Sequence, residues 1–108
     1  NMKKIGQIIY EKGYCKKQPA LNFLGKPLPA YDNLDDNIHE GVVSRKLAWE
    51  NVLNCESGCD AYELYMDVAG RTLWDGRLAP TWAQQSDAIK ERWNDAAECA
   101  IKLRASRG

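Results

Sequence analysis

The spacing of apolar residues predicts a long amphipathic helix in the last quarter of the chain. From about Asp87 onward, apolar residues recur every three or four positions, which is the period of one face of an α-helix. Ser86 and Asp87 precede this pattern and are residue types that cap helix N-termini. The predicted buried stripe consists of Ile89, Trp93, Ala96, Ala100 and Leu103.

Two shorter patterns predict helices over about residues 3–17 and 60–69. The second should end at Gly70, because glycine readily adopts the left-handed conformation that closes many helices. Gly6 and Gly13 interrupt the first pattern, and each is expected to weaken that helix by about 1 kcal/mol relative to alanine.

A third pattern predicts a helix from Asp36 to Asn54, with Asp35 or Asp36 as its N-cap. One basic residue interrupts its apolar stripe, which consists of Ile38, Val42, Arg45, Trp49 and Val52. The opposite face carries Val43 and Leu47, so this helix is apolar on two sides. Such a helix lies either centrally in the fold or half against a partner, and the central position is favoured.

Two segments repeat the same order of residue types. GKPLPAYD at residues 25–32 and GRLAPTWA at residues 76–83 share a glycine, a basic residue, a proline and an aromatic residue in register. Because glycine and proline fix backbone geometry, we interpret each segment as the elbow of a helix–elbow–helix unit. We therefore expect a mainly α-helical single domain over residues 1–108, made of two similar units at about 3–54 and 60–105.

The Asp75-Gly76 pair within the second elbow is typical of a two-residue hairpin turn. The fold can therefore include a short β-hairpin over residues 73–78.

Composition argues against several functions. Fifteen Lys and Arg residues balance fifteen Asp and Glu residues, so no net positive charge attracts nucleic acid or an anionic membrane. No apolar run approaches the length of about 18 residues that suggests a membrane span. We expect an intracellular protein that does not enter membranes.

Candidate catalytic and metal-binding residues are sparse. Cys55 and Cys59 form a single C-x3-C pair, and His39 is the sole histidine, whereas structural zinc sites pair two such doublets. No motif with a known chemical mechanism is present. We therefore expect a protein that is not an enzyme and that binds no metal or cofactor. A thiol or metal-dependent enzyme built on His39 and the cysteines is the less favoured alternative.

The second unit resembles small uncharacterised proteins encoded by tailed bacteriophages. The resemblance rests on Y-E-x-Y at residues 62–65, the elbow at 76–82 and I-x-E-x-W-x-x-x-A at residues 89–97, where the tryptophan is followed by Ala96 and Ala97. The first unit departs from this pattern, because Val42 and Val43 occupy the position expected for the tryptophan. The resemblance implies a phage origin and the host cytoplasm as the working compartment, and it implies no catalytic residue.

These features favour a phage-encoded protein-binding module that docks on a host protein, such as a defence component, and inhibits or redirects it. The expected partner-binding residues are Val43 and Leu47 on the second face of the third helix, and Tyr10 and Tyr14 on an edge expected to be exposed.

The alternative is a nucleic-acid or nucleotide binder, in which Lys26 and Arg77 of the elbows lie beside Tyr31 and Trp82 as stacking rings. For both rings, packing in the core is favoured over stacking on a ligand.

Overall fold

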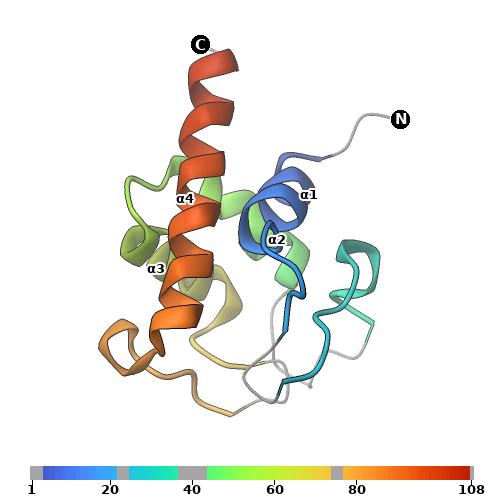
Figure 1. The fold of residues 1–108 in the computed structure, drawn as a ribbon, viewed down its shortest axis with the longest axis vertical. Coiled ribbons are helices and arrows are strands. Elements are labelled where there is room, and N and C mark those ends of the chain that lie inside the picture. Colours follow the sequence, from blue (N-terminus) through green and yellow to red (C-terminus); the bar gives the residue numbers. More distant parts are fainter. Residues whose placement is uncertain (1–3, 22–24, 37–43, 74–76, 108) are drawn as a thin grey trace.

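The chain folds into one mainly helical domain, which confirms the expected fold class. The computed structural model describes residues 4–21, 25–36, 44–73 and 77–107. Within these residues the α-helices are α1 (Ile5–Ile9), α2 (Arg45–Asn51), α3 (Gly58–Ala69) and α4 (Asp87–Arg107). A π-helical turn, Tyr10–Tyr14, continues α1, and a 3-10 turn, Val52–Asn54, continues α2. In Figure 1, α4 runs along the length of the molecule and the shorter helices pack against it, while both elbows lie at the end opposite the C-terminus.

The caps of α3 and α4 agree with the sequence pattern. Gly70 ends α3 in the left-handed conformation, with φ of 75°. The hydroxyl of Ser86 accepts a hydrogen bond of 3.2 Å from the main-chain N–H of Ile89 in the first turn of α4. The whole predicted stripe of α4 is buried or half-buried, from Ile89 to Leu103.

The expectation of a helix beginning at Asp36 is wrong. Asp36 lies in a turn, and α2 begins at Arg45 after Ser44, whose hydroxyl accepts from the main-chain N–H of Leu47. Asp35 also stabilises the start of α2, although it is about ten residues earlier in the chain. Its carboxylate accepts hydrogen bonds from Ser44 Oγ at 2.6 Å and from the main-chain N–H of Arg45 at 2.7 Å. The expected stripe residues Ile38 and Val42 lie outside the described residues.

The core is built from aromatic rings. Trp49 of α2 and Trp93 of α4 stack at its centre, with ring centroids 5.2 Å apart and an interplanar angle of 15°. The rings of Tyr14, Tyr62 and Tyr65 meet Trp93 edge-on, at 4.9 to 5.3 Å. Offset-stacked and edge-to-face pairs are the geometries that aromatic quadrupoles favour. This cluster therefore joins the π-helical turn, α2, α3 and α4.

The two elbows make matching hydrogen bonds. The hydroxyl of Tyr10 donates to the carbonyl of Pro29 at 2.6 Å, and the hydroxyl of Tyr62 donates to the carbonyl of Pro80. Each elbow also contains a main-chain hydrogen bond of 2.9 Å, from Leu28 to Ala20 and from Ala79 to Arg71, and the second elbow has a further one of 2.7 Å from Leu73 to Arg77. These matches concern the elbows alone, and the duplication of the whole unit stays a prediction.

The expected hairpin is reduced to one antiparallel bridge, between Thr72 and Leu78, in the part of the chain that the structure describes. A similar bridge joins Leu21 and Pro27 in the first elbow. The Asp75-Gly76 turn lies outside the described residues.

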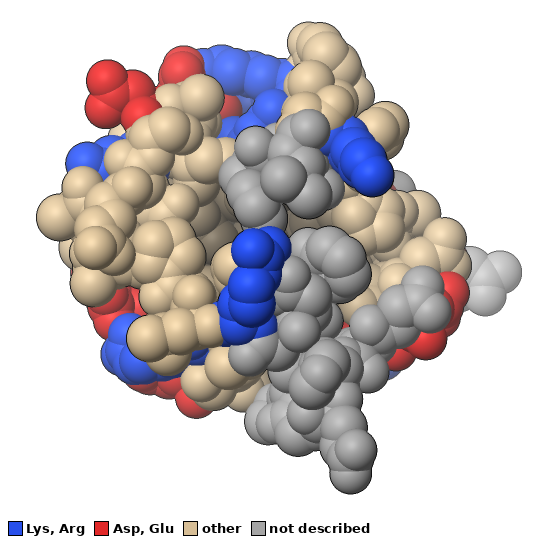
Figure 2. Space-filling model, turned by 90° about the horizontal axis from the view of Figure 1, so that it is seen from below, with Lys and Arg blue, Asp and Glu red and all other residues tan. Residues whose placement is uncertain are grey.

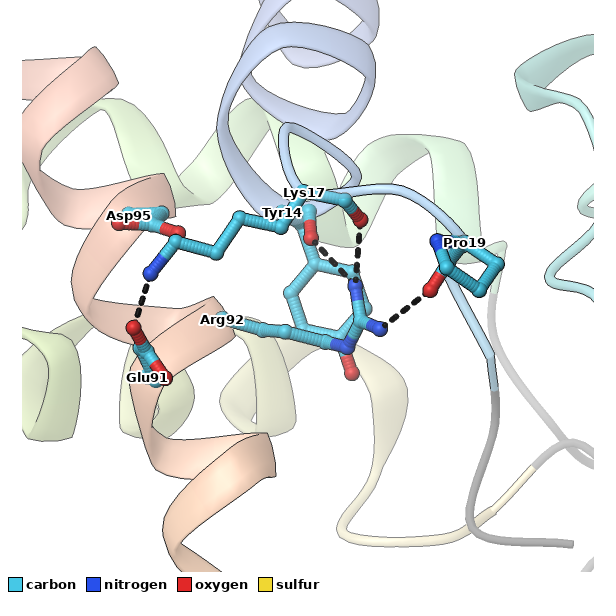
Figure 3. A network of polar contacts seen from close by, with 6 residues as sticks. All are labelled: Tyr14, Lys17, Pro19, Glu91, Arg92 and Asp95. Atoms are coloured by element: carbon cyan, nitrogen blue, oxygen red, sulfur yellow. Dashed lines mark hydrogen bonds and ion pairs between the residues drawn. The ribbon is translucent and has the colours of Figure 1, made fainter. Parts of the chain in front are cut away.

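Basic residues of α4 hold the ends of other helices. The guanidinium of Arg92 donates to the carbonyls of Tyr14 (3.4 Å), Lys17 (3.5 Å) and Pro19 (3.1 Å), just beyond the π-helical turn (Figure 3). Arg104 donates to the carbonyls of Leu53 and Cys55, beyond α2. Both cations lie where a helix leaves its last carbonyls unpaired, which is a favourable position for positive charge.

Two glycines are required by close helix packing. A Cβ atom at Gly13 would lie 2.8 Å from the Cα of Ala96 and 3.0 Å from the Cβ of Cys99 in α4. At Gly6 it would lie 2.9 Å from the main-chain nitrogen of Glu50 in α2. The helix-weakening glycines are therefore the residues that let α1 and its π-helical continuation approach α2 and α4.

Replacing Gly13 with alanine should destabilise the protein, because the added methyl clashes with the main chain of α4. We expect a loss of about 1–3 kcal/mol in the free energy of unfolding, measured by urea denaturation, with Lys12→Ala at the exposed neighbouring position as control. Helix propensity alone predicts the opposite, a gain of about 1 kcal/mol. A more stable Gly13→Ala variant would contradict the close approach.

The elbow hydrogen bonds can be tested with hydroxyl deletions. Tyr62→Phe should lower the free energy of unfolding by about 1 kcal/mol, because the carbonyl of Pro80 loses its donor. Tyr31→Phe is the matched control, since the Tyr31 hydroxyl is buried without a hydrogen-bond partner in the described structure. Its removal should leave stability unchanged or higher. Equal losses in the two variants would argue against the elbow bond.

Candidate site: an aromatic cavity beside the elbows

A cavity of about 340 Å³, partly open to solvent, lies between the helices and the two elbows. Its size falls at the lower end of the range of about 300–1,000 Å³ typical of ligand pockets. Six aromatic residues line it: Tyr10, Tyr14, Trp49, Tyr62, Tyr65 and Trp93. The elbows contribute Leu28 and Pro29 from one side and Pro80 from the other. The cavity is thus a gap in the aromatic core that opens to the surface.

The elbow end of the molecule is shown face-on in Figure 2. Basic side chains lie near the middle of this view and also at its edge, where the acidic side chains lie.

Arg45 is the charged residue among the described lining residues, and only 7% of its surface is exposed. Its guanidinium donates to the Tyr65 hydroxyl at 3.0 Å and to the Thr72 carbonyl at 3.2 Å. Its Nε is buried and has no hydrogen-bond partner. Arg45 makes none of the ion pairs found among the described residues. The cavity wall therefore holds a positive charge whose hydrogen-bond acceptors are neutral.

The other ionisable groups of the wall are phenols held in their neutral form. Burial raises the pKa of Tyr10 and of Tyr14 far above the ordinary value. Burial also raises the pKa of Tyr65, against the lowering effect of the Arg45 charge and its hydrogen bond. The wall at neutral pH is thus uncharged except at Arg45, and it also contains the polar side chains of Asn33 and Gln85.

The thiols offer no activated nucleophile in this region. Burial raises the pKa values of Cys15, Cys55 and Cys99, whereas a reactive cysteine needs a lowered pKa that yields the thiolate. Cys55 is buried and Cys59 is exposed. His39, the histidine of the thiol alternative, lies outside the described residues.

Within the described residues there is neither a cluster of metal ligands nor a membrane-spanning helix. No group of three His, Cys, Asp or Glu side chains there is placed to hold a metal ion. None of the helices in that part combines the length and the apolar character needed to cross a bilayer.

The structure places the expected partner-binding residues in different surroundings. Leu47 is 59% exposed on α2, so the favoured expectation that the fold covers this second face is wrong at Leu47. The expectation that Tyr10 belongs to an exposed edge is wrong, because 3% of it is exposed and its ring packs against Trp49. Tyr10 and the half-buried Tyr14 instead line the cavity. Val43 lies outside the described residues.

The residues expected to bind a nucleotide do not line the cavity. Tyr31 is 3% exposed and packs in the core, so the alternative that it stacks on a base is wrong. Trp82 is half-buried, with its ring 6.0 Å from that of Tyr62 and the Lys90 ammonium 5.8 Å from its centroid. Lys26 and Arg77 are exposed on the elbows.

Most of the cavity residues escaped sequence reasoning because they look like ordinary core residues. The visible signal was Arg45, a basic residue at a buried position of an otherwise apolar stripe. Comparisons with protein-family models, curated proteins and solved structures gave no match to this chain.

The buried phenols should make the fold sensitive to alkali. Burial raises the pKa of all five tyrosines, whereas the unfolded chain titrates near pH 10. The stability from keeping them neutral is therefore complete below about pH 10 and is lost as the pH rises further. We expect tyrosinate absorbance to rise together with unfolding followed by circular dichroism. In denaturant the same titration should centre near pH 10, and native protein whose phenols ionise at that pH would contradict the burial.

Proposed function

We propose that the protein is a binding module that docks on a host protein and inhibits or redirects it, with part of the partner entering the aromatic cavity. The partly open cavity carries this proposal. Clefts lined by aromatic rings, with one or two polar groups, are typical of binding sites rather than of acid–base or nucleophilic centres.

Several properties of the cavity support binding of an apolar group. Aromatic residues dominate the energetics of interfaces, and hot spots form where a side chain fills a desolvated pocket. The aromatic part of the wall comes from helical segments that are joined around the Trp49–Trp93 stack, and the elbows supply the rest. A pocket built on packed helices keeps its shape on binding better than one built on loops, which lowers the entropic cost of association.

The exposed surface offers a second set of apolar contacts. Leu47 and Leu78 are large apolar residues exposed on α2 and the second elbow. A partner seated at the cavity could extend onto Leu78, which is in the same elbow as the lining residue Pro80. A host protein as partner, and the host cytoplasm as compartment, rest on the resemblance to tailed-phage proteins.

A second candidate function is nucleotide binding, favoured by basic side chains on the face that carries the elbows (Figure 2). If the protein binds a nucleotide, the base would stack on the rings of the cavity rather than on Tyr31. Lys26 and Arg77 would contact the phosphates. Because the net charge of the chain is zero, the protein exerts little long-range attraction on a polyanion, which makes this function the less favoured one.

Filling the cavity tests the proposal. Ile89→Trp places a larger side chain at a half-buried lining position of α4, and Ile101→Trp makes the same change at an exposed position of that helix. We expect tagged wild-type protein and Ile101→Trp to retain the same host protein from a bacterial lysate. Ile89→Trp should retain at least about tenfold less, because the entering group loses its space.

Three results would count against this function. If wild-type protein retains no host protein, the module does not act by docking on one. If Ile89→Trp retains the partner as well as Ile101→Trp does, the partner binds elsewhere, and Leu47→Asp would test the exposed face of α2. If a nucleotide is recovered and is lost with Ile89→Trp, the second candidate replaces the first.

A further inference from the structure

We propose that the cavity recognises a carboxylate carried on an apolar or aromatic group, and that Arg45 is the residue that binds the carboxylate. This inference rests on the proposed binding function and specifies the chemistry of the group that enters the cavity. The C-terminal residue of a partner chain combines the two features, as does a small free carboxylic acid.

Arg45 is unusual among the charged residues of the described chain. It is the one buried charged residue there. The basic residues that form ion pairs in the described chain are at least partly exposed: Lys17, Arg71, Lys102 and Arg104. A buried cation without an anionic partner is unfavourable, because neutral acceptors replace only part of the hydration that the charge loses. Its position in a cavity wall gives an incoming anion access to it.

The guanidinium retains hydrogen-bonding capacity. It has five N–H donors, and among the described residues it donates one hydrogen bond from Nη1 to Tyr65 and one from Nη2 to Thr72. The buried Nε has no partner. These two bonds also fix the orientation of the planar group. A carboxylate fits such a fork by accepting two parallel hydrogen bonds, which are stronger and more directional than bonds to a neutral group.

Charge decides which anion fits. Arg45 supplies one positive charge among the described lining residues, and a carboxylate supplies one negative charge. A phosphate monoester carries about −1.5 to −2 near neutral pH, so part of its charge would stay uncompensated in an apolar cavity. An ammonium group would be repelled by Arg45.

Asp35 is an acidic residue whose charge acts on Tyr65 of this site, and its carboxylate already accepts hydrogen bonds elsewhere. Asp35 raises the pKa of Tyr65 through its charge, but its carboxylate accepts hydrogen bonds from Ser44 and from the main-chain N–H of Arg45. It does not line the cavity. Asp35 thus accepts from the main chain of Arg45 and forms no ion pair with its guanidinium among the described residues, so Nε stays without a partner.

The remaining wall selects the body of the ligand. Six aromatic rings and the apolar side chains of the elbows surround the space next to Arg45. A flat or branched apolar group gains from leaving water there. An ion such as acetate alone fills little of the cavity and should bind weakly.

The test compares acids with their neutral amides by isothermal titration calorimetry. The probes are 3-phenylpropionate and 3-phenylpropionamide, together with an acetyl-Gly-Gly-Phe peptide in its free-acid and C-terminally amidated forms. We expect wild-type protein to bind each acid at least about tenfold more tightly than its amide. A stronger acid preference for the peptide pair identifies a chain terminus as the natural source, and a stronger preference for the phenylpropionate pair identifies a free acid.

Variants assign the preference to one residue. Arg45→Met should abolish the tenfold preference while the amides still bind, because it keeps an apolar side chain and removes the charge. Arg71→Met is the matched control, since Arg71 is exposed and pairs with Glu63 and Asp67 at the surface. It should leave the preference intact. The wild-type comparison of acid with amide needs no variant, and so decides the matter even if Arg45→Met does not fold.

The inference is overturned if wild-type protein binds amides as tightly as acids, if it binds none of the four probes, or if the preference survives in Arg45→Met. These outcomes are separate from those of the proposed function. Host-protein retention that is sensitive to Ile89→Trp, without any acid preference, would leave the docking function standing and remove the carboxylate. An acid preference without a retained host protein would leave the carboxylate site standing and remove the docking function.

Discussion

The structure depends on the packing of aromatic rings around the Trp49–Trp93 stack. These two rings join α2 to α4, and tyrosines from the π-helical turn and from α3 close around them. Large rings fill a core only when the main chains that carry them come close. Gly6 and Gly13 provide that approach for α1 and its continuation, and Ala96 and Ala100 are the small residues on the buried stripe of α4.

The same packing produces the cavity. Rigid rings that meet at steep angles leave space that flexible aliphatic chains would fill, and here that space opens between the elbows. Core and candidate site therefore share residues, and Tyr10 and Tyr62 belong to both, because their rings line the cavity while their hydroxyls hold the elbows. Stability and binding are consequently coupled, so a substitution in the cavity has to be judged against a stability measurement.

Arg45 shows how far sequence reasoning reached toward the site. Its place in a buried stripe marked it as an irregularity, but its neighbours were unknown. Tyr65 and Thr72, which hold its guanidinium, come from α3 and the segment just after it, 20 and 27 residues further along the chain. Tyr10 and Tyr14 were expected on an exposed edge and turned out to be cavity residues, because α2 and α4 cover the face that their own segment leaves apolar.

The sequence by itself determined the helical class, the C-terminal end of α3 and the start of α4, because apolar period and capping residues act over a few neighbouring positions. The repeated glycine, proline and aromatic positions likewise located the elbows. Only the tertiary structure decided that Gly13 is needed against Ala96 and that Arg45 faces an aromatic cavity. Each of these depends on a segment distant in the chain, since burial and close approach are properties of pairs of elements and no single pattern encodes them.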